Sequence, residues 1–195
     1  MSISNEKSAN TKAGPIGAGP GSGPTGKPSV TDIEGFDRGT GTGEPTPEVA
    51  HLLRLMKRGD DGYNTRNWVD FLDTLHHHDV LVHQIGFPDT IGLPPHRRDM
   101  DLMINACPDI RVHNDPYDVQ FGQGEWTVAI GKLSGTFTQQ LKFPDGTVIE
   151  PTGKSFLSFF TTIARWQNEQ MVTEYVLYDM QDIMKQLGVG GETKQ

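Results

Sequence analysis

WTVAIGKLSGTFTQQ (residues 126–140) and SFLSFFTTIARWQ (Ser155–Gln167) are two long strand-like runs that frame the segment Pro151-Thr152-Gly153-Lys154. A polar turn follows the second run, then a third strand-like run over residues 171–179 and a short helix over residues 182–187. Most of the strands therefore come late in the chain. The helices come early, and this order is typical of a layered α+β fold rather than of alternating α/β units.

Three helices are predicted before the long strands. Apolar residues at helical spacing predict the first over residues 48–58, which Gly59 ends before a turn at residues 60–62. Thr65 can cap a second helix whose apolar face includes Trp68 and Phe71. A short strand is predicted over residues 80–85 and the third helix over residues 97–106, where Pro108 cannot continue it. Short strands are expected near residues 110–114 and 119–121.

Composition divides the chain into three parts. Residues 14–28 are rich in Gly and Pro and contain a single large aliphatic side chain, Ile16. Such a stretch buries too little apolar surface to offset the entropy lost on ordering. We therefore expect a disordered tail over residues 1–46, a folded domain over residues 47–188 and a disordered C-terminus over residues 189–195.

Charge and composition exclude several classes of function. The formal net charge is −8, whereas general nucleic-acid binding calls for a basic face. No run of 18 apolar residues predicts a membrane span, and the N-terminus lacks the apolar segment of a secretory signal. The single cysteine, Cys107, excludes an internal disulfide and fits a reducing compartment. We expect a cytoplasmic protein that binds neither nucleic acid nor membrane.

Short motifs occur in a fixed order between about residues 65 and 188. They are Asp79-Val80 with His83, Ala106-Cys107-Pro108-Asp109, Gly124-Glu125-Trp126-Thr127-Val128, Gly135-Thr136-Phe137-Thr138, Pro151-Thr152-Gly153-Lys154, Ile163-Ala164-Arg165 and Gln186-Leu187-Gly188. Together they resemble the SnoaL-like polyketide cyclases of the nuclear transport factor 2-like superfamily. The resemblance implies a cone, in which a curved mixed β-sheet wraps round helices and encloses a pocket.

The chemistry of those cyclases does not carry over directly. They close a ring by an aldol reaction without a cofactor, using a carboxylate base and nearby hydrogen-bond donors. The resemblance places Phe137 where the family has its histidine and Thr162 where it has its key aspartate. A threonine is no base unless another group deprotonates it.

Strand alternation and the resemblance together suggest a different set of site residues. In the run 155–167, Ser158, Phe160, Thr162 and Trp166 share one face. With Phe137 they are the expected pocket wall. In the next strand Tyr175 and Asp179 share a face, and the resemblance places His83 at the mouth of the cone.

His83, Tyr175 and Asp179 are the expected catalytic groups, and each also has a structural interpretation. Asp179 can cap the terminal helix, Tyr175 can pack at the rim, and His83 can be a structural histidine. The triplet His76-His77-His78 is interpreted as surface residues at a helix end, because successive side chains point in different directions. No metal or other cofactor is expected.

Two functions remain open. The first is an enzyme without a cofactor, such as a cyclase or isomerase, acting on a small, mostly apolar carbonyl compound. The second is a non-catalytic ligand-binding or dimeric interaction module on the same fold. Leu157, Phe159 and Ile163 point away from the expected pocket, which predicts a homodimer built on the outer face of the sheet. Alternatively, Ile33 and Phe36 cover that face and leave a monomer.

Overall fold

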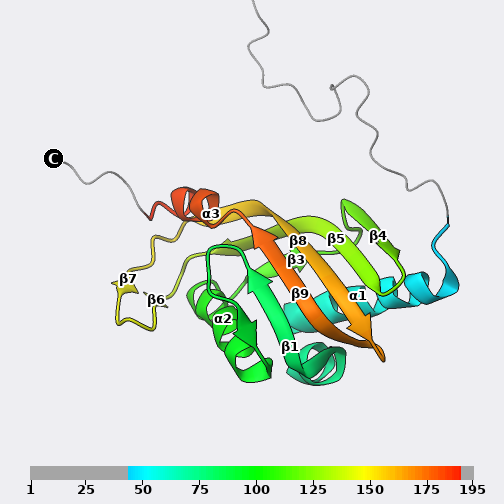
Figure 1. Ribbon diagram of the computed structural model, residues 1–195. Coiled ribbons are helices and arrows are strands. Elements are labelled where there is room, and N and C mark those ends of the chain that lie inside the picture. The colour runs from blue at the N-terminus through cyan, green and yellow to red at the C-terminus, as the bar shows by residue number, and fades with distance from the viewer. Residues whose placement is uncertain (1–43, 190–195) are drawn as a thin grey trace, which may run out of the picture. The chain divides into compact units, whose positions relative to one another are not determined.

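Helices α1 and α2 cover one face of a curved mixed β-sheet in the computed structural model, which describes residues 44–189 (Figure 1). This arrangement confirms the predicted α+β class with a curved sheet around helices. The elements in chain order are α1 (Pro47–Thr65), the π-helical segment η2 (Val69–Asp73), β1 (His76–Gln84), β2 (Thr90–Ile91), α2 (Leu93–Ala106), β3 (Arg111–His113), β4 (Val119–Gln123), β5 (Trp126–Thr136), β6 (Leu141–Lys142), β7 (Val148–Ile149), β8 (Ser155–Gln167), β9 (Gln170–Tyr178) and α3 (Met180–Gln186).

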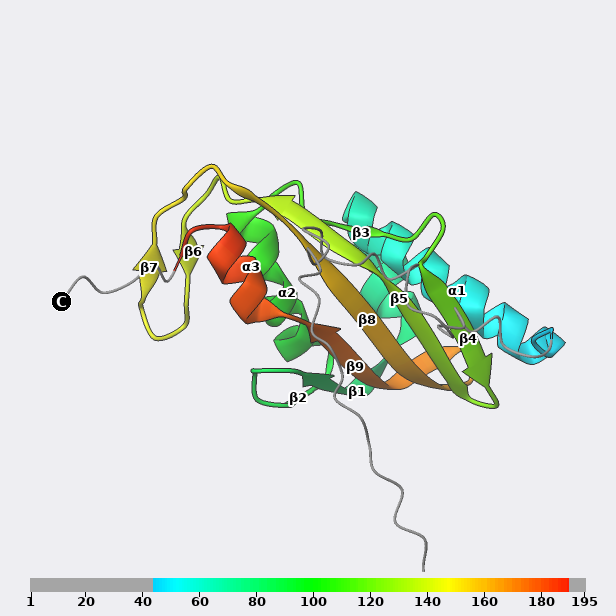
Figure 2. The same cartoon turned by 90° about the horizontal axis from the view of Figure 1, so that it is seen from above.

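Strands β5 and β8 form the middle of the sheet. The run Ser155–Gln167 matches β8, whereas the first predicted run is four residues too long, because β5 ends at Thr136 and residues 137–140 are not in a strand. The strand order is β2-β1-β9-β8-β5-β3, and β4 also pairs with β5. β8 pairs antiparallel with β5 and β9, whereas β1 pairs parallel with β9. Figure 2 shows β5, β8 and β9 crossing the molecule side by side, with the small hairpin β6–β7 projecting beyond them.

The first helix is longer than the sequence predicts. Gly59 does not end α1, and residues 60–62 are helical rather than a turn. Gly62 allows the helix to approach η2 closely, because a Cβ atom there would lie 3.1 Å from the Cβ of Phe71. The helix ends only at Thr65, where Arg66 takes a left-handed conformation with φ of 60°. Tertiary packing thus overrides the helix-breaking tendency of glycine and turns Asp60 towards the inside.

Three other boundaries differ from prediction, and those of β1 and α2 matter for the site. Thr65 caps no second helix: its hydroxyl donates to the Asp61 carbonyl at 2.8 Å, and only η2 and its flanking residues are helical. Strand β1 starts at His76, four residues before the strand predicted over residues 80–85. Helix α2 starts at Leu93 instead of residue 97, with proline in its first turn. Proline suits that position because the first helical N–H groups have no intrahelical acceptor.

The sheet separates a buried inner face from an exposed outer face. Along β8, Phe156, Ala164 and Trp166 are buried on the inner face, while Leu157 and Phe159 are exposed on the outer one. The inner face packs against α1 and α2 in two clusters of apolar side chains. Within residues 44–189, no helix combines the length and the apolar character that crossing a membrane requires. The tail expected over residues 1–46 and the C-terminus expected over residues 189–195 lie almost entirely outside the described residues.

We expect the outer face to be the contact surface of a homodimer. Phe159 is 65% exposed and Leu157 is 54% exposed, and leaving such side chains in water forgoes roughly 1.5–3 kcal/mol each. Light scattering should give a mass near twice the 21.5 kDa of the chain. Phe159→Glu should shift it to the monomer, whereas Val148→Glu, on the separate β6–β7 hairpin, should not. A monomeric wild-type protein would contradict the prediction and leave covering by Ile33 and Phe36, which lie outside the described residues.

Candidate active site in the inner cavity

A mostly apolar cavity of about 70 Å³ lies between the inner face of the sheet and the helices. Four of its polar residues come from three elements: Asp60 from α1, His96 from α2, and Glu174 and Tyr178 from β9. The remaining wall is formed by Tyr63, Phe71, Gln84, Asp99, Met100, Met103, Ile110, Val112, Leu133, Phe160, Val176 and Ile183. An apolar cavity with a few convergent polar groups is the usual form of a small-molecule site.

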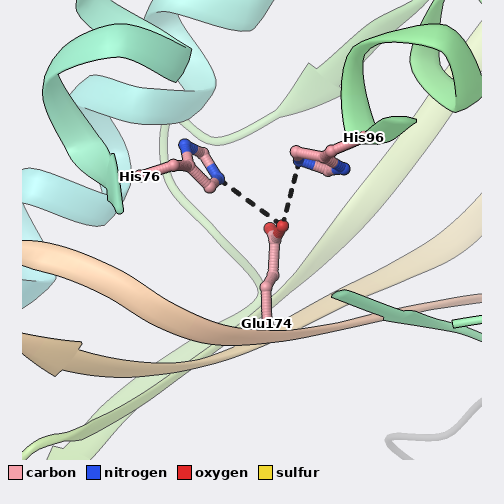
Figure 3. A group of neighbouring side chains, drawn as sticks. All are labelled: His76, His96 and Glu174. Atoms are coloured by element: carbon pink, nitrogen blue, oxygen red, sulfur yellow. Dashed lines mark ion pairs between the residues drawn. The ribbon is translucent and has the colours of Figure 1, made fainter. Parts of the chain in front are cut away.

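Two histidines flank a buried carboxylate at one end of the cavity (Figure 3). Glu174 Oε2 lies 3.5 Å from His76 Nε2 and 3.3 Å from His96 Nε2. All three side chains are buried, with at most 6% of any side chain exposed. Burial alone would raise the pKa of Glu174, but the two imidazoles outweigh it when they are protonated and hold that pKa well below its ordinary value. Glu174 is therefore ionised inside the protein.

His76 is fixed by the turn that precedes it. Its Nδ1 lies 2.9 Å from the carbonyl oxygen of Phe71, and a carbonyl can only accept a hydrogen bond. Nδ1 therefore carries a proton, and Nε2 is the atom that faces Glu174. The ring also packs edge-on against the Phe71 ring, with the centroids 4.9 Å apart.

A second buried carboxylate, that of Asp60, lines the same cavity. Desolvation raises the pKa of Asp60 to about 7, and the negative charge of Glu174 adds to this. The hydroxyl of Tyr117 donates to Asp60 Oδ2 at 2.5 Å, which opposes the shift and fixes the carboxyl group. Asp60 therefore titrates near neutral pH, which suits a group that both takes and returns a proton.

Hydrogen-bond donors are also present in the wall. Gln84 Nε2 donates to the hydroxyl oxygen of Tyr178, so the Tyr178 hydroxyl keeps its own proton to donate. Burial raises the pKa of Tyr178 and of Tyr63, and both remain protonated at neutral pH. The cavity thus joins a carboxyl base to neutral O–H donors.

The predicted catalytic residues do not share a pocket with Thr162. In the antiparallel pair β8–β9, Thr162 lies opposite Val176, while Tyr175 lies opposite Ile163. Thr162 is buried on the inner face, and Tyr175 is 36% exposed on the outer one. His83 pairs with Tyr175 and stacks on it, with ring centroids 4.5 Å apart. The predicted single pocket is therefore wrong, because Tyr175 and His83 lie on the outer face of the sheet.

Asp179 has a structural partner. It is the N-cap of α3, and its Oδ1 accepts from the backbone N–H of Asp182 at 2.9 Å. His83 has one as well, since its Nδ1 lies 2.9 Å from Asp89 Oδ1. Both arrangements match the structural interpretations that the sequence leaves open for these residues.

The residues predicted for the pocket wall are distributed differently. Phe160 lines the cavity. Phe137 is fully buried in the apolar core beside Phe156 and is not part of the cavity wall. Ser158, Thr162 and Trp166 are buried on the inner face outside the cavity wall, where Trp166 Nε1 donates to Thr127 Oγ1 at 2.8 Å.

Four residues of the cavity region were missed from the sequence: Asp60, His76, His96 and Glu174. The interpretation of the histidine triplet as surface residues is wrong for His76, which is only 1% exposed. Glu174 is the single charged residue in the strand MVTEYVLY, which singles out the position but does not show that its side chain faces inward.

Solved structures share this architecture at low sequence identity. A proposed SnoaL-like polyketide cyclase from Jannaschia sp. CCS1 superposes with a TM-score of 0.64 at 14% identity, covering 74% of this chain and 96% of that chain. IdmH, a proposed polyketide cyclase from Streptomyces antibioticus, gives 0.57 at 16% identity, covering 71% and 99%. AclR, a proposed hydroxylase from Streptomyces galilaeus, gives 0.59 at 13% identity, covering 72% and 97%. These likenesses show that the architecture is shared, at sequence identities of 13–16%.

The sequence itself identifies the family. The profile of the SnoaL-like polyketide cyclases matches residues 53–187. The chain belongs to the SnoaL-like polyketide cyclase family. A search of curated protein sequences gave no significant match.

Proposed function

We propose that the inner cavity catalyses proton transfer at a carbon next to a carbonyl group, in a small and mostly apolar compound. The observation that carries this is the buried carboxyl group of Asp60 in the wall of an apolar cavity, where desolvation raises its pKa to about 7. A base with a pKa near the operating pH is the most effective proton carrier. Membership of a cyclase family supports the reaction class.

Asp60 is the proposed base, and tyrosine hydroxyls position it and stabilise the developing charge. Asp60 Oδ1 removes the proton while the Tyr117 hydroxyl holds Oδ2 in place. Negative charge then develops on the carbonyl oxygen of the substrate, and the Tyr178 hydroxyl donates to it. Protonated Asp60 returns the proton to a second carbon or to an alkoxide, which gives an isomerisation or an aldol ring closure. No step needs an organic cofactor.

A deuterium-exchange assay tests the proposal without knowledge of the substrate. Small cyclic ketones and β-keto esters are incubated with the protein in D₂O, and loss of the α-proton signal is followed by NMR. Asp60→Asn should slow the exchange at least about a hundredfold. His83→Ala and Tyr175→Phe, on the outer face, should stay within about twofold of the wild-type rate.

Two other results would contradict the assignment. Loss of exchange in the outer-face variants, with Asp60→Asn unaffected, would move the chemistry to His83 and Tyr175. Absence of exchange for every compound would favour a second candidate, a non-catalytic interaction module. That candidate is supported by the cavity volume of about 70 Å³, below the roughly 300–1,000 Å³ of typical ligand pockets, and by the exposed Phe159.

A further inference from the structure

The buried cluster of His76, His96 and Glu174 has an arrangement that hydrogen bonds do not explain. His76 Nδ1 bonds to the Phe71 carbonyl, so in the neutral ring Nε2 carries a lone pair. That lone pair faces a carboxylate oxygen, which is also an acceptor. Two acceptors buried against each other repel unless a cation lies between them.

None of the three facing atoms has a hydrogen-bond partner within the part of the chain that the structure describes. They are His76 Nε2, His96 Nε2 and Glu174 Oε2. Charge-assisted N–H···O bonds are about 2.7–2.9 Å long, and the observed separations of 3.5 and 3.3 Å are longer. Protons shared between these atoms therefore account poorly for the geometry.

A metal ion accounts for it well. Ligand atoms bound at about 2.0–2.1 Å around a tetrahedral ion lie about 3.3–3.4 Å from one another. The corresponding separation across the right angles of an octahedral site is about 3.0 Å. The distances to Glu174 match the tetrahedral value, and all three ligand atoms lie within 4.8 Å of one another. We propose that His76, His96 and Glu174 bind a divalent transition-metal ion, with Zn²⁺ favoured by the tetrahedral spacing.

The surroundings support an open site rather than a closed structural one. His76 donates its other ring N–H to a backbone carbonyl, the usual way in which a metal-binding imidazole is oriented. His96 and Glu174 line the inner cavity, so an ion bound between them would lie at the cavity wall. Three protein ligands with one free position are typical of catalytic zinc. The proposal stands independently of the proton-transfer function, because it concerns binding of the ion alone.

Binding of Zn²⁺ to the chelator-treated full chain tests the site directly. A second group, His77, His78 and Asp79, is mostly exposed and also has ligand atoms within 4.8 Å of one another. The double variant His77→Ala/His78→Ala removes that group and is the background for every measurement. Calorimetry should give one Zn²⁺ per chain in this background. The melting temperature should rise roughly 5–10 °C with free Zn²⁺ at about a hundred times Kd.

Glu174→Gln in the same background keeps the volume of the side chain and removes its charge. It should weaken Zn²⁺ binding at least about a hundredfold, and Mg²⁺ should cause no shift in either protein because imidazole suits it poorly. Co²⁺ added to the background protein should give the strong visible absorption of a tetrahedral site, a result that needs no further variant to fold. Failure of the background protein to bind Zn²⁺, or equal binding after Glu174→Gln, would overturn the proposal whatever the exchange assay gives.

Discussion

Asp60→Asn is expected to stabilise the folded protein, with a gain that grows as the pH rises from about 4 to about 7. The pKa of Asp60 is raised from 3.8 to about 7 in the folded state, chiefly by desolvation. Between these values the unfolded chain releases the proton while the folded protein keeps it, so the wild type loses stability as the pH rises. An asparagine does not titrate, and the Tyr117 hydroxyl can still donate to its amide oxygen.

The expected gain is about 2–4 kcal/mol at pH 8 and near zero at pH 4, since one unit of pKa corresponds to about 1.4 kcal/mol. Urea unfolding of chelator-treated protein at several pH values measures it. Asp73→Asn, which replaces an exposed carboxylate, is the matched control and should change the free energy of unfolding by less than about 0.5 kcal/mol. A gain at pH 4 equal to that at pH 8 would show that charge at Asp60 is not the cause. A stabilised variant that has lost proton exchange would also exclude misfolding as the reason for the loss.

The fold could be predicted because its determinants are local and repeated. The alternating pattern of Ser155–Gln167 matches β8 at both ends, and β9 differs from its predicted range by one residue at each end. A long strand carries this pattern because successive side chains point to opposite faces, and here one face is buried while the other is exposed. The weak elements, β2 and the hairpin β6–β7, have two residues per strand and were not predicted. Two residues are too few to show a period.

Asp60 and His76 could not be predicted as site residues because they lie at the boundaries of predicted elements, where local signals are weakest. Asp60 was interpreted as part of a turn after Gly59, but close packing of Gly62 on Phe71 continues the helix. His76 was assigned to a helix end and is the first residue of β1. Each error spans only a few residues, yet each moves a side chain from the surface to the inside.

The face of β9 was misassigned for a different reason. Strand alternation places Glu174 and Tyr175 on opposite faces, and the resemblance to cyclases favoured Tyr175 for the inside. Burying an isolated carboxylate is costly, which also argues for Glu174 outside. In the structure Glu174 faces inward and Tyr175 outward, contrary to both arguments. Glu174 can be buried because His76 and His96 converge on it from segments that are distant in the sequence. Such compensation is a tertiary property and is invisible in a single strand.

Phe137→Ala is expected to cost about 3–5 kcal/mol of stability, the usual range for a buried phenylalanine. Phe137 is 0% exposed and belongs to the apolar cluster with Ile110 and Phe156. Its backbone, just after β5, also bonds to the segment before β8: its N–H donates to the Lys154 carbonyl at 2.9 Å, and its carbonyl accepts from the N–H of Gly153. The ring therefore fills core space that no neighbouring segment can close. The melting temperature should fall by at least about 6 °C.

Phe159→Ala is the matched control, because it removes the same ring at a position where the side chain is 65% exposed. In the monomer its cost should stay within about 0.5 kcal/mol, so the comparison is made at a concentration where light scattering shows a single monomeric species. Phe137→His introduces the histidine that the resemblance to the family implies at this position. It should lower stability and leave proton exchange unchanged, because Phe137 lies outside the cavity wall. A faster exchange in Phe137→His would contradict this, and would place the reacting carbonyl beside the family's own position rather than beside Asp60.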